Sequence, residues 1–250
     1  MRILITNDDG LGAAGIALLE RVALVFSDDV TVVAPAEDQS GKSRSLTLTS
    51  PIRIRSVDAR HHAVTGTPTD AVIMALAVIM KDAPPDLILS GINHGANLAE
   101  DVLYSGTAAA AMEGALAGIP SIALSQCYKG TRTALRFDAA EAWAHRVLAP
   151  LIGGAWAPRT MVNINFPPTA DVTGIKVVNQ GLRDYGRPQL DKRSDPRGGD
   201  YYWLALGRVP HTPDVDTDLE ATAQGYITVT PLHLDLTHAP SRARLERLYA

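Results

Sequence analysis

The sequence predicts an α/β protein in which helices cover both faces of a mainly parallel sheet. Short apolar, β-branched runs alternate with longer segments whose apolar residues have helical spacing, and this alternation continues from residue 3 to residue 165. The chain has 250 residues, of which 46% are apolar, enough to bury one sizeable core. We therefore expect a three-layer α/β/α sandwich.

The first three elements set the pattern. Residues 3–5 are a β-branched run that ends in a polar, glycine-rich turn, as expected of a buried strand. Residues 13–26 carry apolar side chains at helical spacing, and residues 30–33 form a second buried strand that stops at Pro35. Further helices are expected at 69–80, 107–116 and 137–151, and further strands at 86–89, 119–124 and 161–165. The loops after parallel strands then lie along one edge of the sheet, where such sheets bind ligands.

Two segments depart from this alternation. Residues 45–64 alternate in the β manner and are expected to form hairpin strands. Residues 179–201 are rich in Arg, Asp, Gly and Pro without a clear period, and a loop this long is functional, a projecting arm or disordered. Strands are expected at 201–204 and 226–230, and a terminal helix at 241–249. We divide the chain into a core, residues 1–168, and a β-rich C-terminal extension, residues 169–250, within one structural domain.

Composition excludes several classes of protein. The formal net charge of −4 argues against a surface built to bind a nucleic acid duplex. Cys127 is the only cysteine, so an internal disulfide is impossible and a cytoplasmic setting is expected. The N-terminus has only three consecutive apolar residues, and apolar stretches such as 71–80 are too short to span a bilayer, so neither a signal peptide nor a membrane partner is expected.

A glycine-rich turn at residues 10–15 matches the G-x-G-x-x-G dinucleotide fingerprint and lies between a strand and a helix. Asp8 and Asp9 precede the first glycine, where they would repel a diphosphate unless a cation lay between them. We therefore favour a structural role for these glycines and keep an NAD-binding oxidoreductase as the rival hypothesis. Residues 40–43 resemble the end of a P-loop, but residue 36 is Ala36 where a glycine is required.

A metal site is predicted at the ligand-binding edge of the sheet. Asp8 and Asp9 end the first strand, and two adjacent buried carboxylates without a partner would destabilise each other. Ser40 and Asn93 supply neutral oxygens in the loops after two later strands. Mg²⁺ and Mn²⁺ prefer such all-oxygen sites. The alternative is a solvated Asp-Asp turn.

A possible anion site precedes the alanine-rich helix at residues 107–116. Ser105-Gly106-Thr107 provides an N-cap, and the small residues of the first turn leave space for a phosphate at the helix N-terminus. Capping alone is the alternative role.

Five motifs closely resemble those of the SurE family, the survival-protein E nucleotidases. They are Ile5-Thr6-Asn7-Asp8-Asp9-Gly10, the loop from Ala34-Pro35 to Ser45, Thr65-Gly66-Thr67-Pro68-Thr69-Asp70, Ser90-Gly91-Ile92-Asn93-His94-Gly95-Ala96-Asn97 and Tyr104-Ser105-Gly106-Thr107. The match runs from residue 1 to about 127 and resumes at 214–231, so it covers most of the chain.

This resemblance implies a Rossmann-like core and a divalent-metal-dependent phosphomonoesterase. The implied substrates are nucleoside monophosphates with a 5′- or 3′-phosphate, with some activity on polyphosphate. Its implied metal ligands are Asp8, Asp9, Ser40 and Asn93, holding one Mg²⁺ or Mn²⁺ per subunit, and its implied phosphate contacts are Asn97, Ser105, Gly106 and Thr107. The extension would exchange elements between subunits of a homodimer or homotetramer, with residues 179–201 as one such element.

The chemistry follows from these parts. Water activated by the metal would attack phosphorus in line, or Asp8 or Asp9 would attack it directly, and the sequence is compatible with both. His94 lies in the Asn93 loop and is either a proton donor to the leaving group or an exposed loop residue. A non-catalytic nucleotide-binding or assembly protein is a third hypothesis beside the phosphatase and the oxidoreductase.

Overall fold

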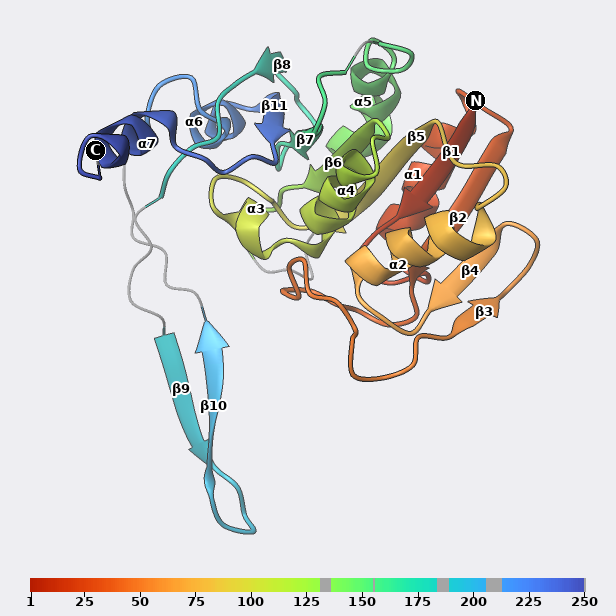
Figure 1. Cartoon of the computed structure of the whole chain (residues 1–250), viewed down its shortest axis with the longest axis horizontal. Helices are drawn as coiled ribbons and strands as arrows, with labels where there is room; N and C mark the ends of the chain where they lie inside the picture. The colour runs from red at the N-terminus through yellow and green to blue at the C-terminus, as the bar shows by residue number, and fades with distance from the viewer. Residues whose placement is uncertain (131–135, 155, 184–188, 206–212, 250) are drawn as a thin grey trace.

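The computed structural model describes residues 1–130, 136–154, 156–183, 189–205 and 213–249 (Figure 1). Within these residues, one nine-stranded sheet has the order β3-β4-β2-β1-β5-β6-β7-β11-β8. Its strands are β1 (Arg2–Thr6), β2 (Asp29–Pro35), β3 (Ile54–Ser56), β4 (His61–Val64), β5 (Leu87–His94), β6 (Ser121–Gln126), β7 (Thr160–Phe166), β8 (Gly174–Val177) and β11 (Tyr226–His233). The six strands from β4 to β7 in this order are parallel to one another.

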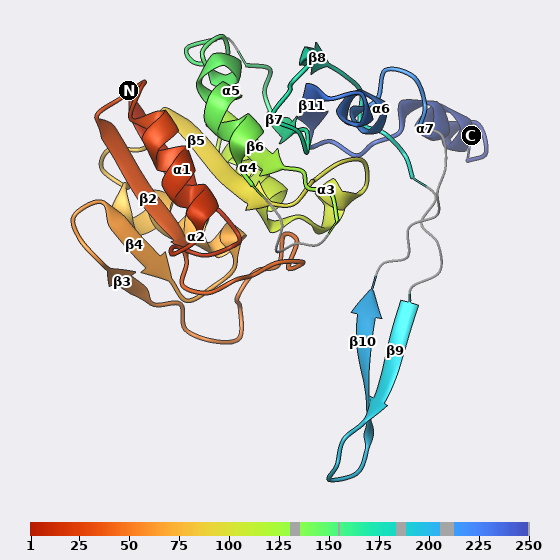
Figure 2. The same cartoon turned by 180° about the vertical axis from the view of Figure 1, so that it is seen from behind.

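Helices cover both faces of the sheet, so the predicted three-layer α/β fold is confirmed. Helices α1 (Ala14–Ala23) and α5 (Asp138–Leu148) lie on one face (Figure 2). On the other face lie α2 (Pro68–Met74), which continues as the π-helical turn η1 (Ala75–Ile79), and α4 (Gly106–Leu116) (Figure 1). None of the helices in the described ranges is long and apolar enough to cross a membrane.

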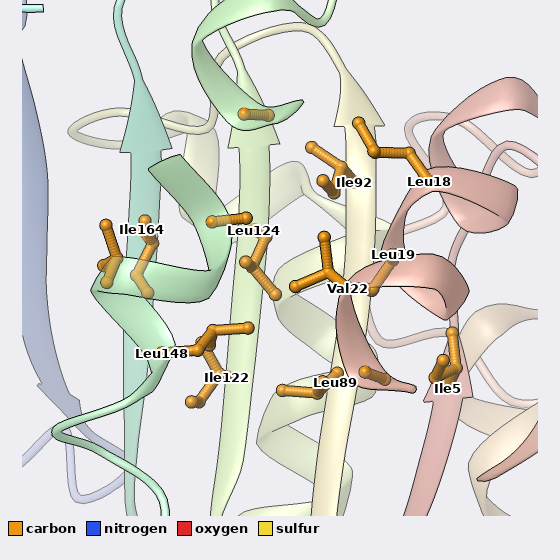
Figure 3. Close-up of a cluster of buried hydrophobic side chains, with 14 of the residues drawn as sticks. Ile5, Leu18, Leu19, Val22, Leu89, Ile92, Ile122, Leu124, Leu148 and Ile164 are labelled. Atoms are coloured by element: carbon orange, nitrogen blue, oxygen red, sulfur yellow. The ribbon is translucent and has the colours of Figure 1, made fainter. Parts of the chain in front are cut away.

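The main core lies between the sheet and the α1/α5 layer (Figure 3). Ile5, Leu89 and Ile122 from neighbouring strands meet Leu19 of α1 and Leu148 of α5, and all five are fully buried. A smaller cluster around Leu4 and Ile88 fills the opposite face. Strands β1, β5 and β6 are therefore buried on both sides, which explains why they appear in the sequence as continuous apolar runs rather than as alternating patterns.

The structure corrects several predicted bounds. The strand predicted at 86–89 is β5 and runs to His94, so Asn93 lies within the strand instead of after it. A register shift between Ser90 and Asn93 interrupts its pairing with β6, and Gly91 there has a φ of +141°. Because the glycine and the register shift interrupt the apolar pattern, the full length of this strand cannot be predicted from that pattern. The helix predicted at 69–80 is divided between α2 and η1.

The segment predicted as a hairpin, residues 45–64, holds strands only in its second half. β3 and β4 pair antiparallel as predicted, and β4 also pairs parallel with β2, which joins the hairpin to the main sheet. Residues 45–53 form no strand. Alternation in this part of the chain is misleading because Thr47 instead bonds the carboxylate of Asp70, with 2.6 Å between the two oxygens.

The C-terminal extension completes the sheet at one edge. β11, which contains the predicted strand 226–230, pairs antiparallel with β7, and the unpredicted β8 pairs parallel with β11. β8 is only four residues long, too short for a period to appear in the sequence. Two short helices, α3 (Asp101–Tyr104) and α6 (Asp218–Ala223), were also not predicted, and the terminal helix is α7 (Ala239–Glu246). The division of the chain at residue 168 stays a prediction.

A β-hairpin projects from the body of the molecule (Figure 1). It consists of β9 (Gln189–Ser194) and β10 (Asp200–Ala205), paired antiparallel. We call these residues, 189–205, the arm. The predicted strand 201–204 lies in β10, whereas β9 was not predicted because its charged sequence shows no alternation.

Candidate active site

A polar cavity of about 530 Å³ lies where the loops after β1, β2, β5 and β6 meet the start of α4. This is the carboxyl edge of the parallel strands, the predicted place for a ligand. Five of the predicted site residues line it: Asp8, Ser40, Asn93, Asn97 and Ser105. The other three do not line it but contact residues that do. Asp9 accepts a hydrogen bond from His94, and Gly106 and Thr107 lie against Asp8.

Asp8 is the buried carboxylate of this cavity, with only 4% of its surface exposed. Its Oδ1 accepts a short hydrogen bond from the Thr107 hydroxyl, which fixes the side chain against α4. Burial raises the pKa of Asp8 to about 6, opposed by the Thr107 hydrogen bond and reinforced by the negative charges of Asp9 and Asp38. A carboxylate in this setting is stabilised by a bound cation.

Asp9 is held by the loop that carries Asn93. Its Oδ2 accepts the backbone N–H of His94 at 3.0 Å. Asp9 lines a smaller hollow of about 200 Å³ with Asp38, and His94 borders both this hollow and the main cavity. Of the two predicted metal carboxylates, Asp8 therefore lines the main cavity and Asp9 the smaller hollow, with His94 bordering both.

Ser40 and Asn93 present oxygen atoms to the cavity. The Ser40 hydroxyl donates to Asp38 Oδ1 at 2.6 Å, and Asn93 Nδ2 donates to the Gly95 carbonyl at 2.9 Å. Since the donors are used, the Ser40 oxygen and Asn93 Oδ1 keep lone pairs for a ligand. In the described part of the chain, no three or more His, Cys, Asp or Glu side chains are arranged so that they could hold a metal ion by themselves, so a cation here needs these neutral oxygens as well as carboxylates. A hard, oxygen-preferring divalent ion fits this set of donors.

The first turn of α4 lies against Asp8. Ser105 is its N-cap, and the Ser105 hydroxyl accepts the Ala108 amide at 3.0 Å. The amides of Gly106 and Thr107 have no helical carbonyl to bond, so they are available to an anion. A Cβ added to Gly106 would lie 2.7 Å from the Asp8 Cβ, so only glycine fits between the helix and the carboxylate. The Thr107 side chain is fully buried and serves Asp8 rather than the cavity.

Asn97 is anchored by polar residues from two buried strands. Its Nδ2 donates to Ser125 Oγ at 2.8 Å, and its backbone amide donates to Asn165 Oδ1 at 2.8 Å. The side-chain amides of Asn163 and Asn165 both donate to the Asn97 carbonyl. These supporting residues were not predicted, although two asparagines two positions apart in an apolar strand are a detectable signal of a polar network, and both are fully buried.

Aromatic residues at the rim of the cavity were also not predicted. Tyr104 and Tyr128 both line it. The His94 ring packs near both Tyr128 and Phe137, with its centroid 6.2 Å from each. His94 is thus packed among rings, a contact that its sequence neighbours do not indicate.

The N-terminus of α1, where an NAD pyrophosphate would lie, opens into the smaller hollow. That hollow is lined by Asp9, Asp38 and Gly15. Two carboxylates there are repulsive to a diphosphate. The glycines of the fingerprint have structural roles instead: Gly10 has a φ of +96° and bonds Asn7, and Gly15 brings α1 close to Ile92.

Comparison with known proteins agrees with the motifs. The family model described as "Survival protein SurE" matches residues 3–187. The chain belongs to the SurE family. A relative from Rhizorhabdus wittichii named 5'-nucleotidase SurE is 59% identical over the full length of both chains. A second, from Erythrobacter litoralis and with the same name, is 54% identical over 95% of both chains.

One solved structure is similar to this chain over its whole length. The crystal structure of the SurE protein from Aquifex aeolicus has a TM-score of 0.84 and 38% identity, covering 100% of both chains. The resemblance predicted from the five motifs is therefore confirmed, and so is the fold that it implies.

Proposed function

We propose that this chain is a divalent-metal-dependent phosphomonoesterase that converts nucleoside monophosphates into nucleoside and phosphate. The observation that carries the proposal is the position of Asp8, a buried carboxylate fixed by Thr107 against the open N-terminus of α4. The carboxylate would repel a phosphate bound at this N-terminus, and a cation between the two resolves the conflict. Both relatives described above carry the name 5'-nucleotidase, which supports nucleotides with a 5′-phosphate as substrates, and a 3′-phosphate presents the same group.

Asp8, Asp9, Ser40 and Asn93 would hold one Mg²⁺ or Mn²⁺ per subunit. When bound, the ion supplies Lewis acidity, which neutralises charge on the phosphoryl group and acidifies water. Thr107 and the His94 backbone amide keep the two carboxylates oriented, since each donates to one of them. Because these hydrogen bonds already hold the carboxylates in place, the side chains need to move less when the ion binds.

The chain's own donors would hold the phosphoryl oxygens. The amides of Gly106 and Thr107 and the dipole of the eleven-residue α4 stabilise negative charge as it develops. Asn97 adds a donor, because only one of its two side-chain N–H groups is needed for Ser125. Asp8 or Asp9 would take a proton from the attacking water or would attack phosphorus directly.

Metal removal should abolish activity reversibly. Dialysis against EDTA is expected to lower phosphate release from adenosine 5′-monophosphate at least 100-fold, since Lewis-acid stabilisation is worth several kcal/mol. Adding Mn²⁺ or Mg²⁺ should restore it. A readout that does not depend on turnover is the melting temperature, which the ion should raise in the wild-type protein and not in Asp8→Asn, because a ligand that binds only the folded state stabilises it.

Three results would contradict this proposal. Turnover that is insensitive to EDTA would exclude the metal, and inactivity with every divalent ion would favour a non-catalytic nucleotide-binding protein. Binding of NADH, detected by its fluorescence, with no phosphate release would favour the oxidoreductase hypothesis.

Inorganic polyphosphate is a second candidate substrate. A further cavity of about 260 Å³ shares Ala96 and Tyr128 with the main cavity and is lined by Lys129 and Arg183. Arg183 is paired with Asp101 at 2.6 Å, so Lys129 is the cation that would attract a longer anionic chain. Absence of phosphate release from polyphosphate by an enzyme that is active on nucleotides would exclude this substrate.

We also propose that the chain assembles through the arm into a homodimer or homotetramer in the cytoplasm. Leu190, Tyr202 and Leu204 lie on one face of the arm, beside the Lys192–Asp200 ion pair, and are 61%, 55% and 67% exposed. Exposed apolar side chains gathered on a projecting hairpin favour association. Sedimentation equilibrium should give a dimer or tetramer mass, reduced in Leu204→Glu, and a monomeric wild-type protein would contradict the proposal.

The proposed cytoplasmic location rests on the single cysteine, Cys127. Phosphatase activity outside the cytoplasmic fraction of cells would contradict it.

A further inference from the structure

Tyr128 stands between the two cavities described above. It lines the main cavity of about 530 Å³, which contains Asp8 and Ser105, and also the adjoining cavity of about 260 Å³. The residue follows the end of β6, and 37% of it is exposed. A tyrosine in this position presents ring surface to a ligand that extends away from the phosphate site.

The ring is held in place by the loop that carries the metal-binding residues. It stacks on the His94 ring with a centroid distance of 6.2 Å and an interplanar angle of 26°, an offset arrangement favoured by aromatic pairs. A Cβ on Gly95 would lie only 3.6 Å from Tyr128 Cε1, so the ring edge lies close to the loop backbone. The preceding residue, Cys127, donates its amide to the Phe166 carbonyl at 2.9 Å, which anchors the chain to β7.

The lining of the cavity combines two kinds of surface. Asp8, Ser40 and Ser105 supply polar groups, and Tyr104 and Tyr128 supply aromatic surface. A nucleoside monophosphate carries the matching groups, a charged phosphate and a flat, apolar base. The volume is within the range of about 300–1,000 Å³ that is typical of small-molecule sites.

We infer that Tyr128 is the residue on which the nucleobase stacks, and that it gives the enzyme its preference for nucleotides over phosphate esters without a base. This inference rests on the proposed function, because it takes Asp8 and α4 as the phosphate end. Stacking on an aromatic ring is tolerant of base identity, since every base has a π-face. Tyr128 therefore selects for the presence of a base and not for one base.

The test compares adenosine 5′-monophosphate with ribose 5-phosphate, which lacks the base. The ratio of kcat/KM for the two substrates should fall about tenfold in Tyr128→Ala, mainly through KM for the nucleotide, since one stacked base contributes of that order. Tyr128→Phe keeps the ring and should restore the ratio to within about twofold. Equilibrium dialysis with adenosine, which has no phosphate, should show a dissociation constant about tenfold higher in Tyr128→Ala than in the wild-type protein.

An unchanged ratio in Tyr128→Ala would overturn the inference while leaving the nucleotidase intact. An equal fall of kcat/KM for both substrates would also overturn the inference, because Tyr128 would then affect the phosphate site or the folding of the protein. If Tyr128→Phe does not restore the ratio, the inference is wrong, because the preference would then depend on a hydrogen bond of the Tyr128 hydroxyl and not on stacking. If the wild-type protein releases phosphate from neither substrate, the proposed function fails, and wild-type-like adenosine binding by Tyr128→Ala would then overturn the inference as well.

Discussion

Replacing Asp8 by asparagine is expected to reduce phosphate release from a nucleoside monophosphate by about three orders of magnitude or more. The substitution removes a buried carboxylate that lines the cavity and that Thr107 holds against α4. Loss of several kcal/mol of charge stabilisation in the transition state corresponds to such a factor, since each 1.36 kcal/mol is tenfold in rate. The measurement is kcat/KM at saturating Mn²⁺.

The same variant should fold normally. Asparagine has nearly the shape of aspartate, and its side-chain oxygen can accept the Thr107 hydroxyl. Because the Asp8 carboxylate is buried and its pKa is raised, a neutral amide should leave the melting temperature without metal equal or higher. Asp82→Asn is the matched control, as Asp82 is exposed beyond the opposite edge of the sheet, and it should keep normal activity. Near-normal turnover by Asp8→Asn would refute its assignment as a metal ligand.

Replacing Gly15 by alanine is expected to destabilise the protein by about 3 kcal/mol or more, at the upper end of overpacking costs. A Cβ at this position would lie 1.9 Å from the Ile92 carbonyl oxygen, which belongs to the backbone of β5 and cannot turn aside. Alanine is intrinsically better than glycine inside a helix, so the loss must come entirely from the helix–sheet contact. Ile92 precedes Asn93, so displacement of β5 should also weaken metal binding.

Gly12→Ala is the control for this prediction. Gly12 belongs to the same glycine-rich turn, but an added Cβ would meet no atom within 4 Å. Its substitution should change the free energy of unfolding by less than about 1 kcal/mol, and can raise it by restricting the unfolded chain. Urea denaturation of the two variants measures the difference. Equal stability of Gly15→Ala and Gly12→Ala would mean that α1 does not approach β5 as closely as the structure shows.

The wrong predictions have a common origin. β5 was predicted to end at residue 89 because Gly91 interrupts the apolar run, yet pairing of Asn93 with Ser125 continues the strand. β8 and β9 were missed because they are short or charged, and each is a strand only because a partner lies beside it. Strand formation by such segments is decided by pairing rather than by local preference.

The sequence by itself determined the layered α/β fold and the carboxyl-edge position of Asp8, Asp9, Asn97 and the Ser105 turn. These follow from short-range rules, since apolar period, caps and the handedness of crossovers act over a few residues or one unit. Only the tertiary structure decided which atoms meet: the Thr107 hydroxyl reaches Asp8 across 99 positions, and Tyr128 stacks on His94. Such contacts depend on how the packed helices and strands place side chains from distant segments, which no local pattern records.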